Sequence, residues 1–105
     1  MRPRVRPGVD VLLDDPSYYL SSPKVGLITN PTGVTGVLTS TLDALYSHHG
    51  VELVSVFGPE HGVRGDRQDA RPIESTVDEA TGVAVYSLYG EVMKPTVEML
   101  DGVEA

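Results

Sequence analysis

The chain contains 105 residues, with 8 Lys or Arg against 15 Asp or Glu, a formal net charge of -7 and 40% hydrophobic residues. These values are typical of one folded globular unit, and nothing in them indicates disorder or a membrane span. The acidic balance argues against nucleic acid as a partner, because binding phosphates requires a basic stripe on the surface. The absence of Cys excludes disulfides, thiolate nucleophiles and zinc–thiolate sites.

Local patterns predict the first elements of the chain. Gly8 to Asp15 is typical of a short helical turn, and Pro16 to Pro23, with two Pro, three Ser and two Tyr, is typical of a connector. The nearly continuous apolar run from Lys24 to Thr29 predicts a strand buried on both faces, as in a parallel sheet. It stops at the turn sequence Asn30-Pro31-Thr32-Gly33.

The middle of the chain predicts a helix followed by a second strand. A stripe at helical spacing predicts a helix from about Thr39 to His49, and its members are Leu38, Leu42, Leu45, Tyr46 and His49. Gly50 is expected to terminate this helix in the left-handed conformation. Glu52 to Phe57 predicts a second strand, and a helical crossover of this length makes the two strands parallel.

The last part of the chain continues the α/β alternation after a long gap. From Gly58 to Gly82 no periodic element appears, and loops of that length are usually functional or disordered. Val83 to Leu88 predicts a third strand, and Pro95 to Leu100 predicts a short helix that ends at Gly102. Residues 103–105 stand where a fourth strand is due. We therefore expect the front portion of a larger α/β protein. Without the rest of the sheet, its unpaired edges favour self-association or partial disorder.

The segment Phe57-Gly58-Pro59-Glu60-His61-Gly62-Val63-Arg64-Gly65-Asp66 concentrates an acid, an imidazole and a guanidinium among three glycines. It and the Asn30 turn each follow the carboxyl end of a predicted parallel strand, where ligands bind in open sheets, so we expect both on one rim. On spacing alone, Glu60 is either a solvated acid in a turn or a general acid or base that desolvation keeps protonated. His61 adjoins Glu60, but neighbours on an extended backbone point to opposite sides, so the two need not pair.

Other charged side chains also have two interpretations. One interpretation is that local ion pairs form among Arg64, Asp66, Arg67 and Asp69. The other is that the planar guanidinium of Arg64 binds a carboxylate of the ligand. For the adjacent histidines 48 and 49, contact with the carbonyls at the helix end is a better explanation than a metal site. The loop glycines lack the spacing of a dinucleotide fingerprint, and no cofactor is expected.

Four runs of sequence carry a resemblance to a known family: VGLITNPTGV, LVSVFGPEHGVRGD, TGVAVYSLYG and KPTVEMLDGV. In this order they closely resemble the exo-β-N-acetylmuramidase family, glycoside hydrolases of peptidoglycan recycling long known as a domain of unknown function. The resemblance spans about Gly8 to Val103 and implies a Rossmann-like domain with a mostly parallel sheet and flanking helices. It implies that residues 1–105 are the N-terminal portion of the catalytic domain, and that the rest of this domain and a C-terminal domain are absent.

The resemblance also implies an activity and a site. Relatives release the non-reducing terminal N-acetylmuramic acid from peptidoglycan fragments, so the implied partner is a muramic-acid-containing glycan. By motif, Glu60 is the catalytic residue, and the residues implied to bind substrate are His61, Arg64, Asp66, Asn30 and Thr32. Glycosidases usually need two carboxyl groups; the second is Asp66, a residue beyond this chain, or the 2-acetamido group of the substrate. Whether the reaction retains or inverts configuration stays open.

The chain is expected to contain only half of an active site, so we expect it to be inactive when isolated. A different class of function therefore also stays open. The alternative is a non-enzymatic carbohydrate-binding or interaction module. The basic start, MRPRVRPG, lacks the apolar stretch of a secretory signal, so the chain as written is expected to be cytoplasmic. Relatives of this kind are often exported, and the compartment stays open.

Overall fold

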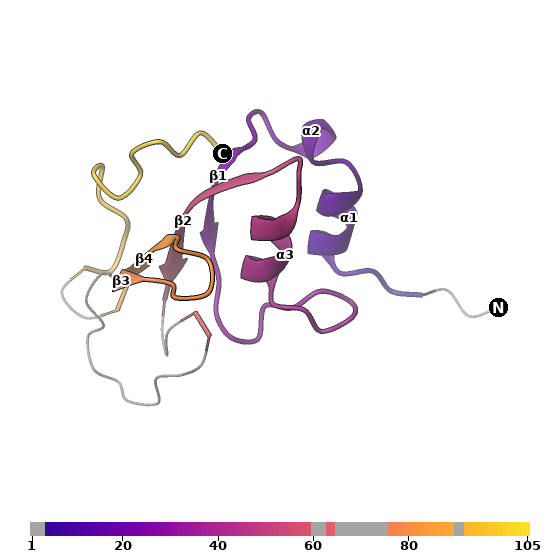
Figure 1. Ribbon diagram of the computed structural model, residues 1–105, viewed down its shortest axis with the longest axis horizontal. Helices are drawn as coiled ribbons and strands as arrows, with labels where there is room; N and C mark the ends of the chain where they lie inside the picture. Colours follow the sequence, from indigo (N-terminus) through magenta and orange to yellow (C-terminus); the bar gives the residue numbers. More distant parts are fainter. Residues whose placement is uncertain (1–3, 60–62, 65–75, 90–91) are drawn as a thin grey trace.

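The chain folds as a small α/β unit in a computed structural model that describes residues 4–59, 63–64, 76–89 and 92–105. Figure 1 shows the helices gathered on one side of a twisted sheet. The helices are α1 (Gly8–Asp14), α2 (Pro16–Tyr19) and α3 (Thr41–Ser47), and the strands are β1 (Lys24–Ile28), β2 (Glu52–Gly58), β3 (Thr76–Val77) and β4 (Ala84–Ser87). The predicted α/β class is confirmed.

The four strands form one mostly parallel sheet in the order β1-β2-β4-β3. The β1–β2 and β2–β4 pairs are parallel, as the strand–helix–strand pattern predicts, and β3 pairs with β4 in the antiparallel direction. β3 lies in the segment where no element was expected, because two residues are too few to give a periodic pattern. The sequence predicts that β4 has an unpaired edge. β3 pairs with that edge, so β4 is not an edge strand.

The core lies between the sheet and α3. Leu42 and Leu45 of α3 are 0% and 4% exposed, and they belong to one cluster with Val25 of β1 and Val56 of β2. Full burial of a side chain of this size stabilises the fold by roughly 1.5–3 kcal/mol. The apolar stripe of the helix and the apolar run of the strands are therefore two halves of the same core.

The opposite face of the sheet is covered in part by the C-terminal segment. Phe57 is 2% exposed and stacks on Tyr86 of β4, with ring centroids 5.5 Å apart. Gly26 of β1 leaves room for Val103, because a Cβ atom at Gly26 would lie only 3.2 Å from the Val103 side chain. The backbone of the last residue, Ala105, then bonds to β1 on both sides of Val25, as a parallel neighbour would: its N–H donates to the carbonyl of residue 24, and its carbonyl accepts the Gly26 N–H, each at 3.0 Å. Residues 103–105 are not a strand of the sheet, but the backbone of Ala105 lies beside β1 as a parallel neighbour would.

Three predictions about the helices are wrong. The predicted connector contains α2, which begins with Pro16 at its first turn, a position where the missing N–H of proline costs nothing. The predicted helix from Thr39 is shorter, because Leu38 lies in a loop with φ of 66° and Ser40 is the N-cap of α3. Its end is not made by a left-handed Gly50: the C-cap residue is His48 in extended conformation.

The predicted helix from Pro95 to Leu100 is also wrong. This stretch forms successive turns, in which Leu100 N–H donates to the carbonyls of Thr96 and Val97 at 3.3 and 3.2 Å. Val97 is 84% exposed, so no buried face offsets the cost of nucleating a short helix. Gly102 does end the turns in the left-handed conformation, with φ of 82°.

Candidate functional site

The carboxyl ends of β1 and β2 lie side by side at one edge of the sheet. Ile28 pairs with Phe57 at the last rung, and the Thr29 N–H donates to the Phe57 carbonyl at 3.0 Å, one residue beyond β1. The Asn30 turn and the segment that begins at Pro59 therefore start from adjacent points. This is the rim that the parallel topology predicts.

The Asn30 turn presents polar side chains at this rim. The Thr32 hydroxyl donates to the Asn30 side-chain oxygen at 2.7 Å, and both residues are exposed. The Gly33 N–H closes the turn on the Asn30 carbonyl at 3.0 Å. Any side chain at Gly33 would collide with the Thr29 hydroxyl, 2.6 Å from an added Cβ atom, so the turn depends on glycine.

The second loop is described only at its two ends. Glu60, His61 and Asp66, three of the predicted site residues, lie outside the described residues. Before them, Gly58 pairs with Ser87 of β4, and its carbonyl accepts the Leu88 N–H at 2.9 Å. After Glu60 and His61, Val63 is 8% exposed and belongs to the core cluster. The predictions for the three site residues stay predictions.

Arg64, the next residue, makes the most extensive polar contacts in the described part of the chain. Its Nε and Nη2 donate to the two carboxylate oxygens of Asp78 at 2.6 and 2.9 Å. Its Nη1 and Nη2 donate to the two carboxylate oxygens of Asp43 at 3.0 and 2.7 Å. We call these three residues the Asp43–Arg64–Asp78 cluster. It ties the loop after β2 to α3, which carries Asp43, and to the turn that joins β3 to β4, which carries Asp78.

The Asp78 carboxylate is saturated with donors. Besides the two bonds from Arg64, one of its oxygens accepts the Thr81 backbone N–H at 3.0 Å and the Thr81 hydroxyl at 2.7 Å. The side chain is 5% exposed. The hydrogen bonds from Arg64 lower the pKa of Asp78 to about 2, against the opposing effect of burial. The same bonds lower the pKa of Asp43 and raise the pKa of Arg64 above its ordinary value. All three residues are therefore charged at neutral pH.

The two aspartates were not among the residues singled out from the sequence. The local ion pairs predicted for Arg64 involved its neighbours, whereas the observed partners lie 21 and 14 residues away. The sequence contains one indirect signal: Asp78 is followed three residues later by Thr81, a spacing at which an aspartate closes a turn on itself. No pattern indicates that the arginine would join it.

These contacts bear on the prediction that Arg64 binds a ligand carboxylate. A guanidinium has five N–H groups, and four of them donate within the cluster. Among the described residues, the remaining Nη1 N–H has no acceptor. A ligand would meet this single N–H or replace Asp43, whose side chain is 42% exposed. Binding of substrate by Arg64 remains a prediction.

The two adjacent histidines have a structural role. The His48 Nε2 lies 2.8 Å from the Leu13 carbonyl, and its Nδ1 accepts the Gly50 N–H at 3.0 Å. These contacts require the tautomer with its proton on Nε2. The hydrogen bond from Nε2 to the Leu13 carbonyl then joins the end of α3 to α1. His49 stacks on His48 with ring centroids 4.7 Å apart. In the described ranges, no group of three or more His, Asp or Glu side chains is placed to hold a metal ion.

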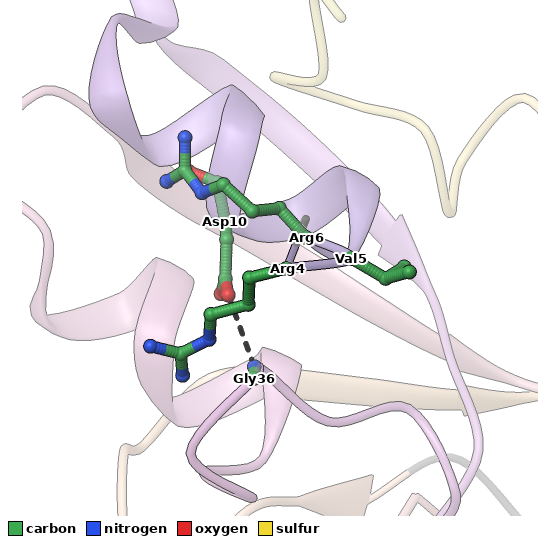
Figure 2. A pocket seen from close by; sticks show the side chains of 5 residues that line it. All are labelled: Arg4, Val5, Arg6, Asp10 and Gly36. Atoms are coloured by element: carbon green, nitrogen blue, oxygen red, sulfur yellow. Dashed lines mark hydrogen bonds between the residues drawn. The ribbon is translucent and has the colours of Figure 1, made fainter. Parts of the chain in front are cut away.

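A separate hollow lies between the N-terminal segment and the loop before α3 (Figure 2). Its volume is about 330 Å³, and it is lined by Arg4, Val5, Arg6, Asp10 and Gly36. Figure 2 shows the Asp10 carboxylate accepting the Gly36 N–H, a bond of 3.1 Å that holds α1 to this loop. None of the predicted site residues that the structure describes lines it. In the part of the chain that the structure describes, no helix is long and apolar enough to cross a membrane.

Known proteins resemble this chain over nearly its whole length. The peptidoglycan beta-N-acetylmuramidase NamZ of Bacillus subtilis (strain 168) is 50% identical over 103 residues, which are 98% of this chain and 25% of that protein. A crystal structure of a DUF1343 family protein from Bacteroides fragilis NCTC 9343 has a TM-score of 0.79 at 47% identity, and the match covers 96% of this chain and 25% of that one. The chain thus spans about a quarter of the length of these relatives.

The family match covers most of the chain as well. Residues 25–105 match the family described as "Exo-beta-N-acetylmuramidase NamZ, N-terminal". This region contains all of the sheet except Lys24, the first residue of β1, and it contains α3, both loops of the rim and the Asp43–Arg64–Asp78 cluster. The chain therefore belongs to the exo-β-N-acetylmuramidase NamZ N-terminal family.

Proposed function

We propose that this chain is the N-terminal portion of the catalytic domain of an exo-acting glycoside hydrolase. Its substrate is a peptidoglycan fragment, from which it releases the non-reducing terminal N-acetylmuramic acid. The observation that carries the proposal is the 50% identity to a peptidoglycan beta-N-acetylmuramidase over 98% of this chain. Because the chain spans a quarter of that protein, the activity is proposed for the complete protein and not for the isolated 105 residues.

The placement of the two loops supports this proposal. The GPEHGVRGD loop starts at Gly58, the last residue of β2, and the Asn30 turn starts beside it. Glu60 is then the carboxyl group that donates a proton to the leaving oxygen or takes one from the attacking group. His61, Asp66, Asn30 and Thr32 are proposed to contact the sugar, as polar groups at the carboxyl end of a parallel sheet are placed to do.

The second catalytic group lies elsewhere in the complete protein, is Asp66, or is the 2-acetamido group of the substrate. The proposed counter-charge for the lactyl carboxylate of muramic acid is Arg64. A carboxylate would approach at the Nη1 N–H of Arg64 that has no acceptor among the described residues.

A substrate panel tests the proposed function. The complete protein is incubated with a synthetic β-N-acetylmuramide, with the matching β-N-acetylglucosaminide, and with a muramide whose lactyl carboxylate is amidated. We expect release of sugar from the muramide and at least about tenfold less from the glucosaminide. Equal rates on the muramide and the glucosaminide, or no release from any of the three, would contradict the proposal.

The amidated muramide tests the substrate contact of Arg64 separately. If the guanidinium binds the lactyl carboxylate, Arg64→Lys raises KM for the muramide and leaves KM for the amidated substrate unchanged. A rise in KM of the same size for both substrates would remove Arg64 from the list of substrate-binding residues.

A further inference from the structure

We propose that Asp43 and Asp78 are positioning residues of the active site, which act on the catalytic loop through Arg64. This inference rests on the proposed function of that loop. The cluster holds the side chain of Arg64, which is four residues after Glu60 in the sequence. Asp43 and Asp78 themselves touch Arg64 and not the substrate.

Both described ends of the short segment around Glu60 are attached to the fold. At one end, Gly58 is the last residue of a central strand and is buried. At the other end, Val63 is in the core, and Arg64 is held by four hydrogen bonds. Four residues separate these two attachment points. A short connection with fixed ends has far fewer conformations than a free loop, and this is the physical basis of the proposed positioning role.

The chemistry of the cluster suits this role. An arginine that bridges two carboxylates is fixed in direction as well as in distance, because its planar fork donates pairs of parallel bonds. Asp78 is held in turn by Thr81, so the arginine is anchored to a rigid turn and not to a freely rotating side chain. The ammonium group of a lysine could not donate paired hydrogen bonds to both aspartates in this geometry.

An ion pair that only stabilises the fold would make the same contacts. The test therefore needs a control ion pair that lies away from the rim. Arg6 and Asp14 form such a pair, in which Nη1 lies 2.6 Å from the carboxylate oxygen, in the N-terminal part of the chain and away from the rim. Asp14→Asn is therefore the control for Asp43→Asn and Asp78→Asn. Asp43→Glu is the conservative variant, because it keeps the charge on a half-exposed side chain.

The experiment measures kcat and KM of the complete protein and these variants on the synthetic muramide. We expect kcat to fall at least tenfold in Asp78→Asn and at least threefold in Asp43→Asn, with KM within twofold of the wild type, because small displacements of a catalytic group cost rate more than binding. Asp43→Glu should return kcat to within about threefold of the wild type. Asp14→Asn should match the wild type.

Two outcomes distinguish failure of this inference from failure of the proposed function. A wild-type protein that releases no muramic acid contradicts the proposed function. An active wild type whose Asp43→Asn variant is folded and keeps its kcat contradicts the positioning role. If Asp78→Asn does not fold, the contrast between Asp43→Asn and Asp43→Glu decides the question. Asp43→Glu with as low a kcat as Asp43→Asn would also overturn the inference.

Discussion

Removing the buried carboxylate of Asp78 is the most informative perturbation of the fold. Asp78→Ala deletes the acceptor of four hydrogen bonds, two from Arg64 and two from Thr81, in a side chain that is 5% exposed. Breaking a fully buried ion pair costs roughly 3–5 kcal/mol. Arg64 keeps its two bonds to Asp43 and is 28% exposed, so water and the second aspartate compensate in part. We therefore expect a loss of about 2–3 kcal/mol in the free energy of unfolding.

Urea denaturation of the 105-residue chain, followed by far-UV circular dichroism, measures this loss. In a thermal scan the same change lowers the midpoint by roughly 10–20 °C, since about 1 kcal/mol corresponds to about 4–8 °C in a domain of this size. Asp14→Ala removes the exposed Arg6 pair and should leave both midpoints unchanged. A loss below about 0.5 kcal/mol for Asp78→Ala would refute the conclusion that the cluster anchors the loop.

Three further predictions concern acid, a helix junction and the covered face of the sheet. The pKa of Asp78 is lowered from the ordinary 3.8 to about 2, so its contribution is present above about pH 4 and is lost as the pH falls toward 2; we expect about 1–2 kcal/mol less stability by urea denaturation at pH 2 than at pH 5 from this group, and an Asp78→Asn variant with the same acid-induced loss as the wild type would contradict this. His48→Ala removes the hydrogen bond that joins the end of α3 to Leu13 of α1 and the local bond from the Gly50 N–H, and should cost roughly 1–3 kcal/mol in urea denaturation, whereas the exposed His49→Ala should change stability by less than about 0.5 kcal/mol; equal effects would show that the bonds of His48 are not the cause. Gly26→Val places methyl groups where the Val103 and Phe57 side chains lie, within 3.3 Å of an added Cβ, and should lower the free energy of unfolding by roughly 1–3 kcal/mol; an unchanged or raised urea midpoint would mean that the C-terminal segment does not pack on β1.

The sheet and its main helix were predictable because their signals are local and periodic. The apolar run from Glu52 to Phe57 corresponds to β2, and the spacing of Leu42 and Leu45 corresponds to the buried side of α3. Parallel pairing then follows from the length of the crossover, and the rim follows from parallel pairing. These steps need no knowledge of distant contacts.

The wrong and missing predictions depend on contacts between residues that are far apart in the sequence, and local patterns do not show such contacts. The segment from Pro95 to Leu100 has a favourable first residue for a helix. Its Val97 side chain is exposed, so no packing stabilises a helix there. The helix end expected at Gly50 is made instead by His48, whose ring reaches the Leu13 carbonyl 35 residues away.

The site shows the same division. The motif and the strand order predict Glu60 and the Asn30 turn as parts of the site. The partners of Arg64 lie 21 and 14 residues from it on other elements, and no periodicity connects them. Such polar contacts depend on the folded arrangement of α3 and the β3–β4 turn, so the structure was needed to find them.

The most direct test of the central claim compares Glu60→Gln with Glu52→Gln in the complete protein. Glu52 is the first residue of β2, exposed and at the end of the strand opposite the rim, so it controls for the loss of one carboxylate from the same strand region. The measurement is the release of N-acetylmuramic acid from a synthetic muramide at saturating substrate. We predict that Glu60→Gln lowers kcat by at least about 100-fold, as removal of a general acid or base does, and that Glu52→Gln keeps the wild-type rate. A folded Glu60→Gln protein with the wild-type rate would contradict the assignment of Glu60 as the catalytic residue.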